Sequence, residues 1–456
     1  MLINKSTIEK FDVPGPRYTS YPTAPEWSES VDSRVYEQKL KQLKNSDKTL
    51  SLYVHIPFCV SMCTYCACNV VIRPKNLKYG DQYIDYLNKE IDLLLKHLGE
   101  QKPIKQLHFG GGTPTFLTSE QLTALMGKIQ KHFKILDDAE VAIEIDPRTI
   151  DLPKVKVLKE LGFNRVSMGV QDFDEDVQRE VNRIQPFDQV KAFYDYCREL
   201  EFDSVNFDLI YGLPRQSPET FEQTLNLVSE LKPDRIALYS FAYVPWLKKH
   251  QNKIRKEDLP TNDQKLDIFL FARQHFLSTG YEAIAMDHFA LADDELARAY
   301  NTGTLYRNFM GYTVKPADEY IGLGLTSIGY LENTFIQNEK VLPRYYRMLD
   351  EGRLPVERGK ELTEDDLIRQ WVIRSLMCHF MLDTKEFSRQ FEIDFNDYFS
   401  AEQPHIDYCL TEELLHQENS VFMVTDLGKL FVRNICMGFD QYFQQKKKER
   451  RFSQTV

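Results

Sequence analysis

The sequence predicts an α/β fold: a partial, TIM-like (β/α)6 barrel with an extended N-terminal arm and a smaller, mainly helical C-terminal domain. Three observations favour this fold class. Short apolar runs alternate with amphipathic stretches from about residue 50 to about residue 290. After about residue 340 the pattern changes to long helix-like stretches. The first 40 residues contain the Pro-rich run Pro14 to Pro22, which excludes a helix there.

The barrel prediction depends on six strand-like runs with helix-like stretches between them. Strand–helix alternation at this spacing is typical of βαβ units, which place parallel strands in one sheet. Six such units favour an incomplete barrel, whose lateral opening would admit a large substrate. In parallel α/β folds the active site gathers at the C-terminal strand ends. The predicted strands are Leu50–His55, Gln106–Phe109, Val141–Ile145, Arg165–Gly169, Ser204–Leu209 and Arg235–Ser240, and the predicted helices are Asp81–Leu98, Ser119–His132, Leu152–Leu161, Phe187–Leu200 and Ser217–Leu231.

The chain is expected to have three consecutive regions. Residues 1–40 would form an arm over the active site, residues 41–340 the catalytic barrel domain, and residues 341–456 the C-terminal domain. In the last region Glu364–Met381 and Leu427–Phe443 are predicted to be long helices. The basic tail from Lys446 to Arg451 is typical of a solvated helix end.

Composition and charge exclude several classes of protein. No run among the 456 residues approaches the roughly 20 apolar residues of a membrane helix, and the first ten residues lack the apolar core of a signal peptide. We therefore expect a cytoplasmic protein in a reducing compartment, and a monomer. The net charge of −11 argues against nucleic acid as the main partner.

Four cysteines fall within ten residues: Cys59, Cys63, Cys66 and Cys68, in the spacing CxxxCxxCxC. Three thiolates on one short loop can hold three irons of a cubane cluster and leave the fourth iron open. A cluster ligated by four Cys mostly passes electrons, whereas an open iron can bind and reduce a small molecule. For this kind of loop that molecule is usually S-adenosylmethionine (SAM).

Zinc is the alternative for this cluster of cysteines. Structural zinc sites usually pair one CxxC with a second pair of Cys or His far along the chain, and no such partner is apparent. A disulfide framework is not expected, because nothing indicates export. The other cysteines stand singly and are interpreted as buried free thiols: Cys197, Cys378, Cys409 and Cys436.

A Gly-rich turn, Phe109 to Thr115, follows the second predicted strand. Glycines let the backbone approach a ligand closely, so Gly111, Gly112 and Thr113 would line a cradle for the methionine part of SAM. Such a turn by itself would fit a phosphate equally well. The GxxxxGK[ST] pattern of a nucleotide P-loop is absent from the sequence.

Further polar residues follow successive strands. Glu144 could pair with a cationic group of a ligand, and Asp208 could bind ribose hydroxyls; Gln171 and Arg183 stand near the next strand end. Any one of them alone is more simply a loop cap or a surface ion pair. Their repetition after a cysteine loop favours a binding site.

Together these residues resemble the oxygen-independent coproporphyrinogen III oxidases (coproporphyrinogen dehydrogenases) of the radical SAM superfamily. The related haem-chaperone branch usually lacks a residue like Cys68, which makes this cysteine a discriminator. The resemblance extends along the chain through Gly15–Pro22, Tyr53–Cys68, Asp208–Pro214, Asp293–Ala297, Arg307–Thr313 and Arg433–Asp440.

The resemblance implies a [4Fe-4S] cluster and two SAM molecules in one active site. The chain differs from the family pattern at Met310, where Gln is common in the family, and at Ala67, where Gly is usual. Met310 cannot make the hydrogen bonds of a Gln amide at this position. The implied cluster ligands are Cys59, Cys63 and Cys66; the implied contacts of the cluster-bound SAM are Tyr53, Gly111, Glu144 and Ile328, and those of the second SAM are Tyr65, Gly112, Thr113, Gln171, Arg183, Asp208 and Ala242.

The implied activity is an oxidoreductase reaction in anaerobic haem (porphyrin) biosynthesis. The reduced cluster would cleave SAM to methionine and a 5′-deoxyadenosyl radical, and 5′-deoxyadenosine forms when this radical takes hydrogen from a propionate side chain. Each of two propionates of coproporphyrinogen III, as the radical left by hydrogen abstraction, would then lose CO2 and one electron and become a vinyl group, giving protoporphyrinogen IX. A small electron-transfer reductant is the implied partner.

Catalytic roles are expected for Tyr53, Cys68, Arg17 and Arg307. The substrate carries four carboxylates, and Arg17, Arg183 and Arg307 are candidates to bind them with paired hydrogen bonds. The alternative for Arg17 and Arg307 is that each forms a structural ion pair. Cys68 could instead take part in redox chemistry or serve only in packing. The alternative functions are a haem-binding chaperone and a radical SAM paralogue acting on another tetrapyrrole.

Overall fold

The computed structural model describes residues 10–445, which form two compact units. The first, here called the barrel unit, comprises residues 28–279 and 315–361. The second, the interleaved unit, is built from three separate parts of the chain, with its described residues in 10–27, 280–314 and 362–445. Residues 1–9, considered above for a signal peptide, and the basic tail from Lys446 lie outside the described residues.

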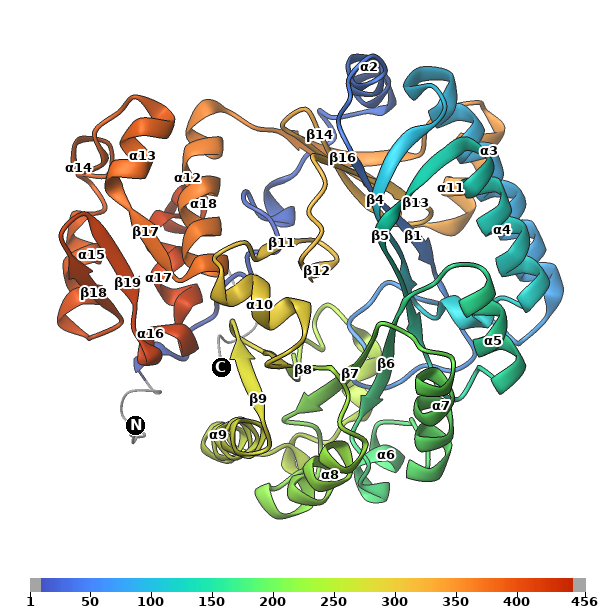
Figure 1. Ribbon diagram of the computed structural model, residues 1–456, viewed down its shortest axis with the longest axis horizontal. Coiled ribbons are helices and arrows are strands. Elements are labelled where there is room, and N and C mark those ends of the chain that lie inside the picture. The colour runs from blue at the N-terminus through green and yellow to red at the C-terminus, as the bar shows by residue number, and fades with distance from the viewer. Residues whose placement is uncertain (1–9, 446–456) are drawn as a thin grey trace. The chain divides into compact units, whose positions relative to one another are not determined.

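All six predicted strands are present in the barrel unit, and neighbouring strands pair in parallel (Figure 1). Their order is β1-β4-β5-β6-β7-β8. Five of them are longer than predicted, and β8 has the predicted bounds. The strands are β1 (Leu50–Ile56), β4 (Lys102–Gly111), β5 (Phe133–Ile145), β6 (Arg165–Gln171), β7 (Ser204–Tyr211) and β8 (Arg235–Ser240).

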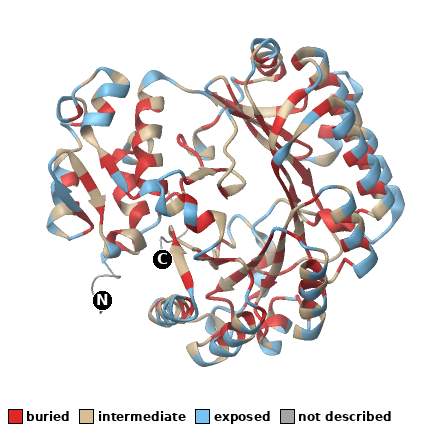
Figure 2. Ribbon diagram, in the orientation of Figure 1, coloured by how far each residue is buried: buried red, intermediate tan, exposed pale blue. Residues whose placement is uncertain are grey.

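The predicted helices lie between these strands, on the outer side of the sheet (Figure 1). Side chains accept hydrogen bonds from the first free backbone amides of several of them: Thr118 and Ser217 form capping boxes, and Asp151 caps a third helix. Figure 2 shows buried strands beneath helices whose outer faces are exposed. The helices are α3 (Leu77–Leu98), α4 (Ser119–His132), α5 (Leu152–Glu160), α6 (Glu175–Glu180), α7 (Phe187–Glu199), α8 (Pro218–Leu231) and α9 (Asn262–Ser278).

The sheet extends beyond the predicted strands. The strand β13 pairs in parallel with β1, and β14, β15 and β16 continue the sheet in antiparallel order. The prediction missed this extension because it has no strand–helix repeat. The added elements are β13 (Glu319–Leu323), β14 (Ile328–Leu331), β15 (Thr334–Asn338), α11 (Leu342–Asp350) and β16 (Val356–Glu361).

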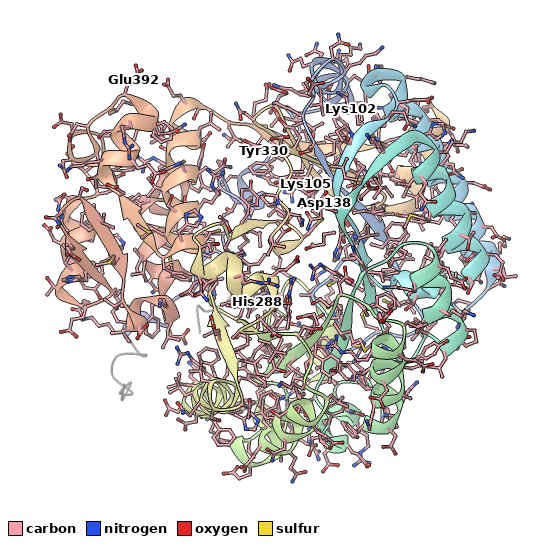
Figure 3. All side chains as sticks on the ribbon, viewed as in Figure 1. Lys102, Lys105, Asp138, His288, Tyr330 and Glu392 are labelled. Atoms are coloured by element: carbon pink, nitrogen blue, oxygen red, sulfur yellow. The ribbon has the colours of Figure 1, made fainter. Side chains whose placement is uncertain are left out.

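Residues at the N-terminal edge of the sheet are charged. Lys102 and Lys105 of β4 and Asp138 of β5 lie there (Figure 3). Lys102 is buried and donates a hydrogen bond to the carbonyl of Leu43, 2.6 Å away, at the end of α2 (Ser33–Leu43). Helix α2 begins after the cap residue Asp32, inside the range 1–40 that was predicted to be an arm, so these residues are helical rather than extended. Gly15–Pro22 form neither helix nor strand, and the position of the arm over the active site stays a prediction.

The C-terminal part of the interleaved unit is mainly helical, as predicted for the C-terminal region, but its helices are shorter than expected. Residues 341–361, which the prediction included in that region, belong to the barrel unit. The predicted helix Glu364–Met381 is α-helical only to Arg374, continues as a π-helical turn, and gives way to a strand at Met381. The predicted helix Leu427–Phe443 is three short helices. The C-terminal elements are α12 (Glu364–Arg374), β17 (Met381–Asp383), α13 (Thr384–Phe391), α14 (Phe395–Tyr398), α15 (Gln403–Thr411), β18 (Leu415–Glu418), β19 (Val421–Val424), α16 (Asp426–Leu430), α17 (Val432–Phe439) and α18 (Gln441–Gln445).

The central part of the interleaved unit consists of two hairpins and a helix. They are β9 (Tyr281–Ile284) with β10 (His288–Leu291), α10 (Glu295–Asn301), and β11 (Tyr306–Asn308) with β12 (Gly311–Thr313). All eight cysteines are free, and Cys197, Cys378, Cys409 and Cys436 are buried as predicted. Over residues 10–445, no helix combines the length and apolarity that crossing a membrane requires.

Candidate active site

Polar side chains form a row across five neighbouring strands of the barrel unit. We call Tyr53, His108, Glu144, Ser167 and Asp208 the polar row. The Tyr53 ring stacks on His108 with 5.9 Å between the ring centroids, and His108 Nε2 lies 3.3 Å from Glu144 Oε1. Ser167, paired with Glu144 in the sheet register, donates to Asp208 Oδ2 at 2.9 Å. Alternate residues of β6 and β7 are fully buried, so the row occupies the more open face of the sheet.

The cysteine loop runs between the short strands β2 (Phe58–Cys59) and β3 (Val71–Ile72). Other parts of the barrel unit hold it on both sides. The amide of Thr64 donates to the carbonyl of Val181 at 3.0 Å, and Asn182 Nδ2 donates to the carbonyl of Met62 at 2.8 Å. On the other side His250 Nε2 lies 2.7 Å from the carbonyl oxygen of Cys66. The loop is therefore fixed by contacts that do not use its thiols.

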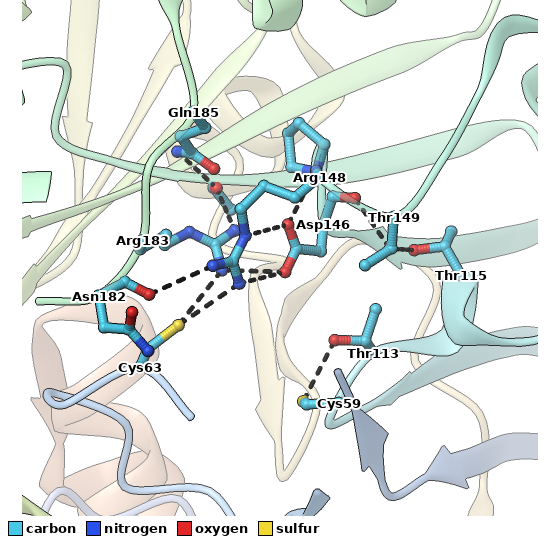
Figure 4. A network of polar contacts seen from close by, with 12 residues as sticks. Cys59, Cys63, Thr113, Thr115, Asp146, Arg148, Thr149, Asn182, Arg183 and Gln185 are labelled. Atoms are coloured by element: carbon cyan, nitrogen blue, oxygen red, sulfur yellow. Dashed lines mark hydrogen bonds and ion pairs between the residues drawn. The ribbon is translucent and has the colours of Figure 1, made fainter. Parts of the chain in front are cut away.

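Each of the three predicted ligand cysteines has a polar neighbour. Cys59 Sγ lies 3.3 Å from Thr113 Oγ1, and burial raises the pKa of the Cys59 thiol to about 11. Arg148 donates to Cys63 Sγ at 3.5 Å (Figure 4). A hydrogen bond with the Cys68 thiol, together with the nearby positive charges of Lys248 and Arg183, outweighs burial and lowers the pKa of Cys66 to about 7.

A buried aspartate orients two arginines toward the cysteine loop. Arg148 Nη2 and Arg183 Nη1 both bind Asp146 Oδ2, at 2.7 and 3.1 Å, and both guanidinium groups also approach Cys63 Sγ (Figure 4). Burial opposes ionisation of Asp146, but the charge of Arg183 and the hydrogen bonds from Arg148 lower its pKa to about 2. Asp146 therefore holds two positive charges beside a predicted cluster ligand.

These residues fit an iron–sulfur cluster. The donors are three thiols from one loop, and thiolates are the ligands that hold Fe–S clusters. Over residues 10–445 no group of three His, Cys, Asp or Glu is arranged around a single point, as one metal ion would require. A cubane cluster does not need that arrangement, because each thiolate binds a different iron. The arginine charges beside Cys63 would balance the negative charge of a thiolate-bound cluster.

The Gly-rich turn lies directly against the cysteine loop and the polar row. A Cβ atom on Gly112 would lie 2.6 Å from the carbonyl oxygen of Pro57, and one on Gly110 would lie 2.8 Å from Glu144 Oε1. Gly111 has a φ of +123° and donates its amide to Glu144 Oε2 at 3.2 Å. The absence of side chains here lets the turn pack directly against Tyr53, Glu144 and the start of the cysteine loop.

The residues predicted for the second SAM form two smaller groups. A Cβ atom on Gly169 would lie 2.8 Å from Gln171 Nε2 and 2.9 Å from Arg183 Nη2, so these side chains lie together at the end of β6. The side chain of Gln251 donates to the carbonyls of both Tyr65 and Ala242, at 3.0 and 3.1 Å. These two residues are therefore joined through one amide.

Asp208 differs from its predicted setting, and Ile328 lies in a strand that was not predicted. Asp208 lies within β7 rather than at its end, and Asn206 and Ser167 donate to its carboxylate at 2.9 Å each. Ile328 begins β14, and its backbone would meet a Cβ atom on Gly322, the residue paired with Tyr53. The backbone of Ile328 thus approaches the polar row from the missed strands.

Arg17 and Arg307 belong to the interleaved unit. Arg307 Nη1 donates to the carbonyl of Arg17 at 2.7 Å, and Arg433 donates to the carbonyls of Pro16 and Gly15. Burial opposes ionisation of Asp287, but its neighbours His288, Arg307 and Arg17 hold its pKa well below the usual range. These contacts support the structural alternative for Arg307, and binding of a substrate carboxylate by Arg17 and Arg307 stays a prediction.

Sequence reasoning missed several residues of this site. The signal for His108 was a polar residue between the buried Leu107 and Phe109; that for Asp146 and Arg148 was their place directly after β5. His55 was also missed. Its Nδ1 atom lies 3.1 Å from Tyr53 Oη, and burial lowers its pKa to about 4.

Cys68, for which a catalytic role was expected, is exposed.

Comparison with known proteins agrees with this geometry. Residues 53–228 match the model of the radical SAM superfamily. The oxygen-independent coproporphyrinogen III oxidase of Synechocystis sp. is 43% identical over 98% of this chain and 97% of its own length, and that of Escherichia coli is 42% identical over 98% and 97%.

This chain belongs to the oxygen-independent coproporphyrinogen III oxidase family. A solved structure of the Escherichia coli coproporphyrinogen III oxidase, described as a radical SAM enzyme, superimposes with a TM-score of 0.90 at 42% identity, covering 93% of this chain and 97% of that one. Membership in this family, together with the thiol donors, supports a [4Fe-4S] cluster and SAM as the cofactors.

Proposed function

We propose that this chain is an oxygen-independent coproporphyrinogen III oxidase. It converts two propionate side chains of coproporphyrinogen III to vinyl groups, giving protoporphyrinogen IX and CO2, in haem biosynthesis. The observation that carries the proposal is the combination of the cysteine loop, the polar row and near full-length identity to enzymes of this name. The cluster and SAM, when bound, supply the oxidising radical, with methionine and 5′-deoxyadenosine as by-products.

The chain's own residues bind and orient these groups. Cys59, Cys63 and Cys66 would hold the cluster. Glu144, which already accepts the Gly111 amide, has a second oxygen beside His108 and could accept a hydrogen bond from the SAM ammonium group. Asp208 is half-buried on the same face, where a carboxylate can bind ribose hydroxyls.

Two SAM molecules per active site are part of the proposal. Tyr53, Glu144, Gly111 and the Ile328 backbone, which lie near one another beside the Gly-rich turn, are assigned to the first. Tyr65, Ala242, Gln171 and Arg183, with Gly112, Thr113 and Asp208, are assigned to a second. Equilibrium binding of SAM to the reconstituted protein should approach two equivalents per chain. Saturation at one equivalent would contradict the second site.

The function is tested under anaerobic conditions with the reconstituted cluster, dithionite, SAM and coproporphyrinogen III. We expect stepwise loss of two carboxyl groups as CO2, with release of 5′-deoxyadenosine. Mass spectrometry of the porphyrins, after their oxidation, measures the loss. Cys59→Ala should abolish both, whereas Cys197→Ala, which removes a buried thiol of α7, should retain both.

Two other results would contradict the proposal. Release of 5′-deoxyadenosine with an unchanged tetrapyrrole would show a radical SAM enzyme with another substrate. An inactive protein that binds haem stoichiometrically would favour a chaperone.

A further inference from the structure

A basic segment lies beside the cysteine loop; its inner residues hold that loop, and its outer residues have no part in the site described above. Between Lys248 and Lys256 the sequence contains five Lys or Arg residues and no Asp or Glu, in a chain with a net charge of −11. The segment includes the short 3-10 helix Lys249–Lys253. A run of this kind is ordinarily a solvated surface, so its contacts decide whether it has a further role.

The segment is attached directly to the cysteine loop by hydrogen bonds. Lys248 Nζ donates to the carbonyl of Cys68 at 3.0 Å, His250 Nε2 lies 2.7 Å from the carbonyl oxygen of Cys66, and Gln251 Nε2 donates to the carbonyl of Tyr65 at 3.0 Å. Below these bonds Ile254 packs in one apolar cluster with Val181 and the Tyr65 ring. The segment and the cysteine loop therefore form one rigid part of the barrel unit.

The outer side of the segment is exposed and mixed in character. Lys249 and Lys253 are exposed, and the described residues provide neither an ion pair nor a side-chain hydrogen bond for their ammonium groups. Just before them Trp246 is 51% exposed and Leu247 is 65% exposed. Exposed lysines alone need no explanation, but a large aromatic and a leucine exposed beside them are typical of a protein-binding surface.

We propose that Trp246, Leu247, Lys249 and Lys253 form a docking surface for an acidic one-electron carrier protein that reduces the cluster. This inference rests on the proposed function, because that reaction needs an external electron. The carrier is oxidised by one electron and the cluster is reduced by one, with no proton transferred between them. Lysine charges attract an acidic partner and orient it, and Trp246 and Leu247 supply the apolar contact.

Binding is measured first on the full-length protein without its cluster, so that the result does not depend on activity. The probe is a flavodoxin of net negative charge. We expect Lys249→Glu/Lys253→Glu to weaken its binding by about tenfold or more, and the affinity of the wild-type protein to fall as salt is raised. Trp246→Ala should weaken binding with little change in its salt dependence.

A matched control reverses two charges far from the loop. Lys41→Glu/Lys134→Glu changes exposed lysines at the N-terminal edge of the sheet, one near the end of α2 and one at the start of β5. This control should bind flavodoxin like the wild-type protein. Equal weakening by the two double variants, or none by Lys249→Glu/Lys253→Glu, overturns the proposal.

Turnover of the reconstituted enzyme then separates the docking surface from the function itself. With reduced flavodoxin as the electron source, Lys249→Glu/Lys253→Glu should slow 5′-deoxyadenosine formation; with dithionite it should match the wild type. A raised KM for coproporphyrinogen III with dithionite would show that the lysines attract the tetracarboxylate instead, and would overturn the proposal. Failure of the wild type with dithionite would reject the proposed function, while the binding result would still stand.

Discussion

At the scale of single residues, the most informative contact is that of Arg148 with Cys63. The guanidinium is held by Asp146 and donates to Cys63 Sγ at 3.5 Å. Hydrogen bonds and positive charge directed at a cluster sulfur stabilise the reduced, more negative cluster and so raise its reduction potential. Arg148 is therefore expected to act as a positioning and electrostatic residue toward the cluster.

Arg148→Gln should lower the reduction potential of the reconstituted cluster. If the lost interaction favours the reduced state by about 1 kcal/mol, the potential falls by roughly 40 mV for a one-electron couple. A redox titration monitored by electron paramagnetic resonance measures this shift. Arg165→Gln is the matched control, because Arg165 pairs with Glu140 at 3.4 Å near the N-terminal end of β6. Identical potentials in the two variants would argue against the role of Arg148.

At the scale of elements, the Gly-rich turn can approach the cysteine loop closely because glycine has no side chain. A Cβ atom at position 112 would lie 2.6 Å from the carbonyl oxygen of Pro57, so Gly112→Ala must displace one of the two segments. Overpacking of this kind costs about 1–3 kcal/mol. We expect a folded protein with strongly reduced cluster incorporation, measured as iron and sulfide per chain after reconstitution.

Gly127→Ala provides the control for this substitution. Gly127 lies in α4 with open space at its Cβ position, and alanine there should stabilise the protein by about 0.5–1 kcal/mol with normal cluster incorporation. If Gly112→Ala also incorporates a full cluster, the turn does not set the position of the loop.

A buried carboxylate joins several elements of the barrel unit. Glu90 of α3 accepts hydrogen bonds from the Gly324 amide at 2.8 Å, Asn338 Nδ2 at 2.6 Å and Tyr345 Oη at 2.5 Å. Burial outweighs these bonds and raises the pKa of Glu90 from 4.5 to about 7. Helix α3, the β13–β14 turn, β15 and α11 thus meet at one ionisable group.

The raised pKa of Glu90 predicts a pH dependence of stability. Between about pH 4.5 and 7 the folded protein holds a proton that the unfolded chain has lost, so stability falls as pH rises through this window and levels off above it. The full effect is roughly 3 kcal/mol. Unfolding free energies of the cluster-free protein from pH 5 to 8 should show a smaller slope for Glu90→Gln than for the exposed control Glu160→Gln. Parallel slopes would contradict the prediction.

At the scale of the whole molecule, the interleaved unit is assembled from parts far apart in the sequence. Tyr18 donates to Asp440 at 3.1 Å, Gln370 donates to the carbonyl of Tyr21 at 2.8 Å, and Arg433 binds the carbonyl of Pro16 at 2.8 Å. The side chains of Phe11, Tyr18 and Tyr21, which belong to this unit, are buried. The N-terminal segment therefore depends on the C-terminal residues for its structure.

Ending the chain after Glu361 should release this segment. Without residues 362–456, Phe11, Tyr18 and Tyr21 lose the partners that bury them, and we expect rapid cleavage within residues 10–27 by limited proteolysis. The full-length protein should be protected at the same sites. Equal protection of residues 10–27 in the truncated and full-length proteins would contradict this prediction. It would mean that contacts outside residues 362–456 hold the N-terminal segment.

The sequence alone determined features that depend on near neighbours. Periodic apolar residues defined the strands β1, β4, β5, β6, β7 and β8 and the helices between them, because each element buries one face. The spacing of Cys59, Cys63 and Cys66 indicated a cluster site, because three thiols on a loop of ten residues cannot lie far apart.

Only the tertiary structure decided what meets across long separations. Arg183 and Cys63 are 120 residues apart, and β13 pairs with β1 after most of the barrel unit has intervened. The limits of the α12 and α17 helices also depended on packing, since helical periodicity continued beyond them. Local patterns specify which face is buried but not its partner. The partner is set by packing and hydrogen bonds that must repay the entropy of closing long loops.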